Sequence, residues 1–192
     1  VDRMTISYIP NAGFAGSDSF TYIASNNGAD SAPATVTISV ASPTITVSAG
    51  GALTATVGVP YGETFTFNGG TQPFTGYQVT GLPAGVQVGS SGANTVSIIG
   101  TPTSAGSFTL TVSATDSSTG SGPFGASQTF TLVVAAPTLS MAPGAGALTA
   151  AYNTPFTQAF TASGGVGPFT YALTGALPAG LSFTGNSISG TA

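Results

Sequence analysis

The sequence contains no cysteine, histidine, lysine or tryptophan. The absence of cysteine excludes a disulfide scaffold, a thiolate metal site and a cysteine nucleophile. Without histidine and lysine, the usual general bases and imine-forming amines are missing. The few acidic residues form no carboxylate pair at a usable spacing. The sequence therefore predicts neither an enzyme nor a cofactor-binding protein.

Charge of either sign is scarce, because the 192 residues include one basic residue, Arg3, and five acidic ones. Charged residues make up 3% of the chain, whereas an average soluble domain has about 25%. A net charge of −4 with a single cation cannot neutralise a phosphate backbone, which excludes nucleic acid as a partner. No apolar run approaches the roughly 18 residues of a membrane span, so no membrane insertion is expected in this segment.

Threonine and serine take the place of charge on the expected surface. In FTFNGG (65–70), SFTLTVSATD (107–116) and TFTLVV (129–134), large apolar residues alternate with hydroxyl residues. This period of two places apolar side chains on one face of a strand and hydroxyls on the other. Such segments recur about every ten residues between glycine and proline turns, and the 28 glycines and 13 prolines disfavour long helices. The pattern predicts an all-β sandwich of the Greek-key type.

A long internal repeat divides the chain. Residues 42–85, which begin SPTITVSAGGALTATVGVPYGETFTF, return at 136–180 as APTLSMAPGAGALTAAYNTPFTQAF. Pro43 matches Pro137 at an offset of 94, whereas Phe74 matches Phe169 at an offset of 95. Many identities over this length, with a one-residue slip, indicate two copies of one domain.

The repeat predicts one complete domain between two partial ones. Residues 43–136 form the complete sandwich, residues 1–41 the closing half of one repeat, and residues 137–192 the opening half of another. The first half is expected to contain strands at Met4–Ile9, Asp18–Ser25 and Ala34–Ala41. The strands expected in the complete sandwich are 44–48, 53–57, 63–68, 75–80, 95–99, 107–115 and 127–135.

Two groups of motifs resemble known repeats. LPAGVQV, SIIGTPTSAGSFTLTVSATDS and FTLVV are similar to the immunoglobulin-like repeats that stand in tandem in very large bacterial surface proteins. The segment ISYIPNAGFAGSDSFTY, followed by ATVTISV, resembles the closing half of a related cadherin-like bacterial repeat. The resemblance implies tandem immunoglobulin-like sandwiches in bacterial adhesins, fibres or matrix proteins, located at the cell surface or secreted.

Each partial domain is expected to leave an apolar sheet face uncovered. Burying one such side chain stabilises a fold by about 1.5–3 kcal/mol, so leaving a whole face exposed costs as much as a domain's net stability. Two explanations stay open: the chain, which begins within an expected strand, is a piece of a longer array, or the halves of successive chains complete one another head to tail. The expected assembly interface consists of Phe20, Tyr22, Val36, Ile38, Phe156, Phe160, Phe169, Tyr171 and Leu181.

Other candidate sites are weaker. Asp18 and Asp116, expected at equivalent strand edges, are weak calcium candidates, because a calcium site needs six to eight oxygen ligands; a turn-capping role is the better interpretation of Asp18. Tyr61 and Tyr152 are flanked by turn residues and are expected to be exposed. The predicted function is a structural segment of a bacterial extracellular fibre or stalk, whose partners are copies of itself or adjacent repeats. The alternative is an adhesive module that recognises a glycan or a host-surface protein.

Overall fold

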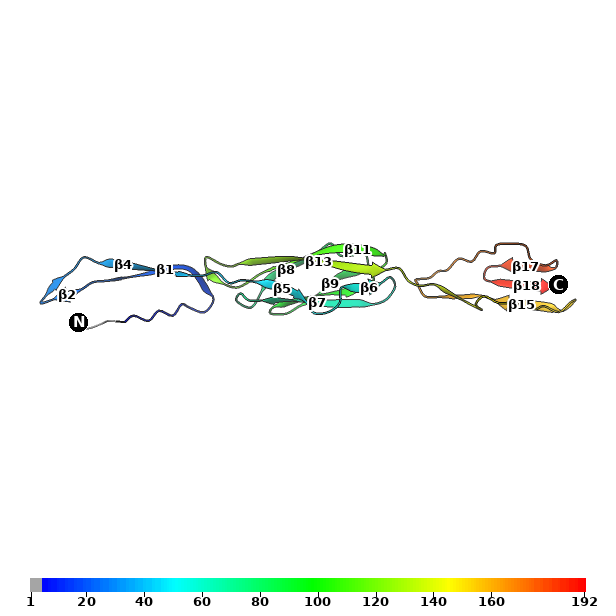
Figure 1. Ribbon diagram of the computed structural model, residues 1–192, viewed down its shortest axis with the longest axis horizontal. Helices are drawn as coiled ribbons and strands as arrows, with labels where there is room; N and C mark the ends of the chain where they lie inside the picture. The colour runs from blue at the N-terminus through cyan, green and yellow to red at the C-terminus, as the bar shows by residue number, and fades with distance from the viewer. Residues whose placement is uncertain (1–4) are drawn as a thin grey trace.

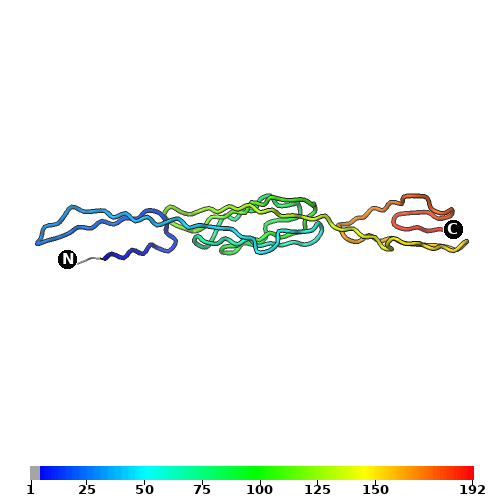
Figure 2. The backbone as a smooth tube through the Cα atoms, in the orientation of Figure 1, coloured from blue at the N-terminus to red at the C-terminus, as the bar shows by residue number. Residues whose placement is uncertain are grey.

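The computed structural model describes residues 5–192, and every regular element within them is a β-strand. The chain forms three parts that follow one another along a single long axis (Figure 1). The N-terminal hairpin lies at one end, the C-terminal part lies at the other, and the chain is most densely packed in the central part (Figure 2). In this described range, no helix is present that could cross a membrane.

The central part is a sandwich of two four-stranded sheets, whose orders are β5-β7-β10-β9 and β6-β13-β11-β8. All seven strands expected here are present, which confirms the all-β immunoglobulin-like class. Sequence patterning missed β9, which lacks the alternation of a half-buried strand and is mostly exposed. The bounds are β5 Thr46–Ala49, β6 Thr54–Thr56, β7 Tyr61–Asn68, β8 Thr75–Thr80, β9 Val86–Ser91, β10 Thr95–Gly100, β11 Gly106–Thr115, β12 Thr119–Gly120 and β13 Gly125–Ala135.

The hydrophobic core lies between these two sheets. Phe65 and Ile98 come from one sheet, Leu110 and Leu132 come from the other, and all four side chains are fully buried. In β7, buried positions alternate with more exposed ones, so the period of two seen in the sequence matches the inward and outward faces. The core is confined to the central part: among the described residues outside it, the buried hydrophobic ones are Ala15 and Ile188.

The N-terminal part is an antiparallel hairpin of β1 (Phe14–Tyr22) and β4 (Ala34–Val40). A two-residue ladder of β2 (Ser25–Asn26) with β3 (Ala29–Asp30) forms its tip. The expected strand at 34–41 is confirmed, whereas the one at 18–25 begins and ends earlier than expected. The strand expected at 4–9 is wrong for residues 5–9, which carry no strand; Met4 lies outside the described residues.

The C-terminal part repeats one sheet of the sandwich. The order β15-β18-β17 reproduces β7-β10-β9, while β14 pairs with β16 as β5 pairs with the end of β7. Phe156 lies opposite Gly190 in this sheet, as Tyr61 lies opposite Gly100 in the sandwich. The bounds are β14 Ser140–Ala142, β15 Pro155–Ala159, β16 Thr161–Ser163, β17 Leu181–Thr184 and β18 Ser187–Thr191.

Strands are present in the outer parts only where a partner strand exists. In the sandwich, β6 pairs with β13 and β8 pairs with β11. Their counterparts, residues 149–151 and 170–174, carry no strand, because residues 137–192 contain no counterpart of β13 or β11. A strand without a neighbour leaves its backbone groups without ladder hydrogen bonds.

The same reason corrects the prediction for residues 5–9. The segment ISYIP at 6–10 corresponds to VSIIG at 96–100 in β10, which pairs with β7 and β9. The N-terminal part has no counterpart of β7 or β9, so this segment, although its sequence resembles a strand, has no ladder to join.

Candidate functional site

The β1–β4 hairpin presents one apolar face. Phe20 lies opposite Val36, and Tyr22 and Ile38 stand two positions further along their strands, so all four side chains share that face. Phe20, Val36 and Ile38 are half-buried, while Tyr22 is 48% exposed. The structure thus brings together the four N-terminal residues predicted from the sequence.

The hairpin has the same register as the central strand pair of the sandwich. Val40 lies three residues before Pro43 and pairs with Gly16, just as Val134 lies three residues before Pro137 and pairs with Gly106. This correspondence places Phe20 at the position of Leu110, Tyr22 at Val112, Val36 at Phe130 and Ile38 at Leu132.

Equivalent positions therefore differ in burial. Val112 and Leu132 are 0% exposed in the sandwich, whereas their counterparts on the hairpin are open or only half-covered. An open hollow of about 690 Å³ lies over the hairpin face. The hollow is lined by Ile6, Phe20, Tyr22, Ile23, Ala24, Ser25 and Val36.

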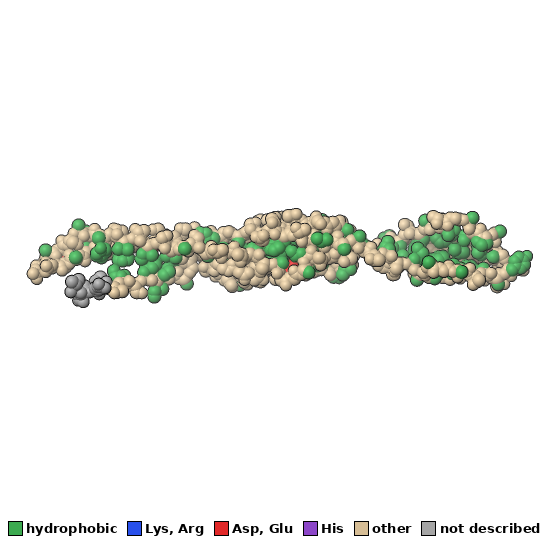
Figure 3. Space-filling model, in the orientation of Figure 1, with side chains coloured by type: hydrophobic (Ala, Val, Ile, Leu, Met, Phe, Trp, Pro, Cys, Tyr) green, Lys and Arg blue, Asp and Glu red, His purple; other side chains and the backbone are tan. Residues whose placement is uncertain are grey.

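The C-terminal part presents the second uncovered face. Hydrophobic side chains gather in its open interior (Figure 3). TYALTG at 170–175 aligns with TGYQVTG at 75–81, without a counterpart of Gly76, so Leu173 corresponds to the core residue Val79. Leu173 is 42% exposed, against 9% for Val79. The hydroxyl of Tyr171 accepts a hydrogen bond from the backbone N–H of Ala162 at 2.9 Å. All five predicted interface residues of this part are half-buried, namely Phe156, Phe160, Phe169, Tyr171 and Leu181.

Sequence reasoning missed several residues of this face. Leu139, Met141 and Leu148 are 63%, 56% and 44% exposed and line two open hollows beside Phe160 and Phe169. The repeat could have identified them, because they correspond to Ile45, Val47 and Leu53, which pack against the core of the sandwich.

Asp116 organises the end of the sandwich that faces the hairpin. Its carboxylate is 2% exposed and accepts hydrogen bonds from the backbone N–H groups of Thr71 (3.0 Å), Ser118 (3.1 Å) and Phe124 (2.8 Å). The Ser118 hydroxyl donates a fourth bond at 2.5 Å. Burial by itself raises the pKa of Asp116, but these hydrogen bonds outweigh it and lower that pKa from its ordinary value.

The loop held by Asp116 docks onto the hairpin. β12 pairs in parallel with the first two residues of β1. Gly13 and Ala15 each accept a backbone hydrogen bond from this loop, from Thr119 at 2.9 Å and Ser121 at 2.8 Å. Ala15 is 2% exposed at this joint. The sandwich and the hairpin are therefore connected by a small continuous sheet in addition to the chain itself.

The two calcium candidates are not brought together as a site. Asp18 lies within β1, opposite Ile38, so the prediction that it caps a turn and matches Asp116 in position is wrong. Its carboxylate accepts hydrogen bonds from the Tyr8 hydroxyl at 2.9 Å and the Ser19 N–H at 2.8 Å. Over residues 5–192, His, Cys, Asp and Glu form no group of three that could hold a metal ion.

The two tyrosines expected on the surface differ. Tyr152 is 93% exposed, as expected. Tyr61 instead packs against the core, and the prediction for it is wrong. Burial and the nearby Glu63 carboxylate raise the pKa of Tyr61 to about 12.

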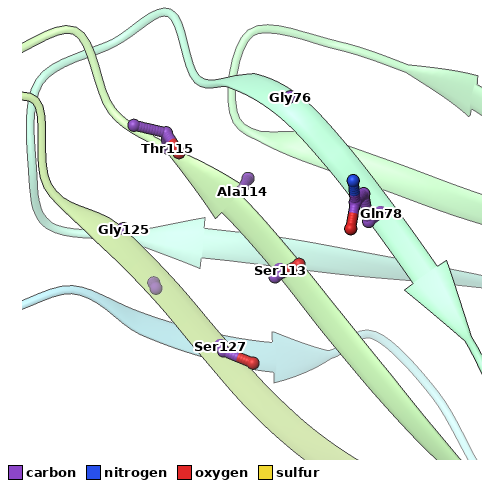
Figure 4. A pocket seen from close by; sticks show the side chains of 8 residues that line it. Gly76, Gln78, Ser113, Ala114, Thr115, Gly125 and Ser127 are labelled. Carbon is purple, nitrogen blue, oxygen red and sulfur yellow. The ribbon is translucent and has the colours of Figure 1, made fainter.

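A polar trough crosses the outer face of β8, β11 and β13 (Figure 4). Gln78, Ser113 and Ser127 point into it from the three strands, and Gly76 and Gly125 line it without side chains. Because its lining residues include neither a charged nor an aromatic side chain, the trough offers a ligand no strong anchor.

Comparison with known families agrees with the fold. Residues 1–39 match the family described as bacterial Ig domain. No curated protein matched the chain. The chain is an all-β protein with an immunoglobulin-like sandwich, and its N-terminal part is similar to a bacterial Ig-like repeat. This similarity indicates a structural or surface repeat module. The domain boundaries 1–41, 43–136 and 137–192 stay a prediction.

Proposed function

We propose that this chain is a structural segment of a bacterial extracellular fibre or stalk. In this segment, immunoglobulin-like sandwiches follow one another along one axis, and strands of a neighbouring module cover the faces of the two outer parts. The observation that carries the proposal is the contrast between equivalent positions. Side chains that are fully buried in the central sandwich have counterparts in the outer parts that are left open.

The free energy of covering these faces favours end-to-end association. Each large apolar side chain that moves from an exposed to a buried position contributes about 1.5–3 kcal/mol. Both faces run along the long axis of the chain, one at each end (Figure 3). A contact between opposite ends of successive modules is heterologous and does not close on itself, so it produces a linear array.

The joint between the hairpin and the sandwich supports a stiff role. The parallel pairing of β1 with β12 and the buried Asp116 loop restrict bending at this joint. At the other joint, the chain passes through Pro137, whose ring fixes the backbone angle φ. Both joints thus favour a rod over flexibly linked beads.

Assembly of the purified chain tests this proposal. We expect light scattering across a dilution series to show that the particle mass rises with protein concentration. Negative-stain electron microscopy should show filaments in which each chain adds the length of two sandwiches. A chain that stays monomeric at high concentration, with both faces still accessible to a hydrophobic dye, would contradict covering by a second copy.

An adhesive module that binds a glycan or host-surface protein is the second candidate, because Tyr152 is 93% exposed. Exposed aromatic rings provide stacking surfaces for sugars. A glycan array probed with the chain and with Tyr152→Ala tests this role. Tyr61→Phe is the matched control, since Tyr61 packs against the core. Binding that is lost in Tyr152→Ala alone would favour adhesion.

A further inference from the structure

We propose that the open face of the C-terminal part is filled by the β1–β4 hairpin of a second copy of this chain, in one defined register. The inference rests on the proposed function, since it names the neighbour that covers the face. It also specifies which strands of the neighbour enter and which segment has to leave.

The C-terminal part lacks the two central strands of one sheet. In the sandwich, this sheet has the order β6-β13-β11-β8. Residues 149–151 and 170–174 correspond to its outer strands β6 and β8 and are present without strand structure. The missing element is therefore an antiparallel pair, two strands wide, between these segments.

The β1–β4 hairpin is such a pair. It repeats the register of β11 with β13, with Gly16 opposite Val40 where the sandwich has Gly106 opposite Val134. Its apolar face carries the counterparts of Leu110, Val112 and Leu132, which are fully buried core residues. Asp18 takes the position of Phe108, which is only partly buried, so its carboxylate stays near solvent.

The sandwich also specifies how the hairpin meets its neighbours. Thr111 of β11 lies opposite Thr80 of β8, and Val133 of β13 lies opposite Thr54 of β6. The corresponding contacts between two copies are Thr21 with Thr174 and Ser39 with Thr149. These pairings supply the partners whose absence leaves 149–151 and 170–174 without strand structure.

Residues 6–9 have to leave when the hairpin docks. They correspond to Val96–Ile99 of β10, and β18 of the accepting copy corresponds to the same strand. β18 is held by ladders to β15 and β17. Residues 6–9 are held by no ladder; Ile6 lies over the hairpin face, and the Tyr8 hydroxyl bonds Asp18. β18 of the accepting copy therefore keeps its place, and residues 6–9 of the entering copy leave the hairpin face. The segment 6–9 thus acts as a removable cover of that face.

Engineered disulfides test the register without interference, because the chain has no cysteine. We expect the double variant Thr21→Cys with Thr174→Cys to form disulfide-linked dimers and higher oligomers under oxidising conditions. The two positions lie in opposite end parts of one chain, so the link forms between chains (Figure 1). The control pairs Thr21→Cys with Thr170→Cys, four residues or roughly 13 Å further along the strand, and should not cross-link.

The outcomes separate this inference from the proposed function. Filaments of the unmodified chain, with equal cross-linking in the test and control pairs, would overturn the register and leave the structural role standing. A chain that never assembles would overturn this inference and the covering of the open faces by a second copy.

A second variant tests the cover. Replacing Ile6 by serine removes the apolar side chain of the cover that lines the hollow over the hairpin face, so the concentration needed for assembly is expected to fall about tenfold. The matched control, Thr5→Ser with Ser7→Thr, should leave the concentration needed for assembly unchanged. An unchanged or higher concentration for Ile6→Ser would overturn the displacement of residues 6–9.

Discussion

Asp116 illustrates how one residue can organise a joint in a chain that is almost free of charge. A buried carboxylate is costly unless its oxygens are hydrogen-bonded, and here four donors from three residues converge on it. The same loop then pairs with β1. The sequence marked Asp116 only as a weak calcium candidate, because its role at the joint depends on the Thr71 N–H, which lies 45 residues away in the chain, and on the pairing of its loop with β1.

Replacing Asp116 by asparagine is expected to destabilise the sandwich by about 1–3 kcal/mol, because one acceptor oxygen becomes a donor that faces backbone N–H groups. Chemical denaturation followed by intrinsic tyrosine fluorescence measures the change. Asp30→Asn, at an exposed position of the hairpin tip, serves as the control and should leave the midpoint unchanged. An unaltered midpoint for Asp116→Asn would refute the structural role of the carboxylate.

Stability should also depend on pH through Asp116. Its folded-state pKa lies below the ordinary value of 3.8, so the unfolded chain takes up a proton first as the pH falls. The stabilisation is fully present above pH 3.8 and is lost as the pH falls through the folded-state pKa. The free energy of unfolding, measured by chemical denaturation at a series of pH values from 6 to 2, should become more similar for the unmodified chain and Asp116→Asn as the pH falls. A difference in the free energy of unfolding that stays constant over this pH range would contradict the role of the Asp116 carboxylate.

At the scale of elements, strand formation follows from the partner strands and not from the strand's own sequence. Residues 5–9 and 170–174 have strand-like sequences but no ladder, whereas β9 has little alternation and still pairs with β10 over most of its length. Local patterning reports which face of a strand is apolar. Whether a ladder forms depends on segments far away in the chain.

Truncating a side chain should lower the free energy of unfolding more in the β11–β13 pair of the sandwich than at the equivalent position of the β1–β4 hairpin. Leu132→Ala removes a fully buried side chain and is expected to cost about 2–5 kcal/mol. Ile38→Ala, at the equivalent half-buried position of β4, should cost well under half of that in the dilute, monomeric chain. Denaturation at low protein concentration compares the two variants. Equal costs would mean that the hairpin face is already covered in the monomer.

At the scale of the whole molecule, the linear arrangement depends on its joints. Gly120 lies in the joint with φ of +77°, and an added Cβ would stand 2.2 Å from the carbonyl oxygen of Ala15. Any side chain at this position would therefore force β12 away from β1. Gly125, by contrast, has open space around it.

Gly120→Ala is expected to loosen the joint. Spin labels attached at Thr35→Cys and Thr131→Cys, both on exposed strand positions, report the distance between hairpin and sandwich. The distance distribution should broaden in Gly120→Ala and stay narrow in the control Gly125→Ala. An equally narrow distribution in both variants would show that the linker alone keeps the two parts aligned.

The sequence by itself determined the all-β class, the tandem repeat and the identity of most residues on the two open faces. These features arise from local alternation and from similarity between segments, which a sequence displays directly. Only the tertiary structure decided that residues 5–9 form no strand, that Tyr61 packs against the core and that Asp116 holds a joint. Each of these depends on hydrogen bonds or packing between residues far apart in the chain, and such contacts leave no periodic signal in the sequence.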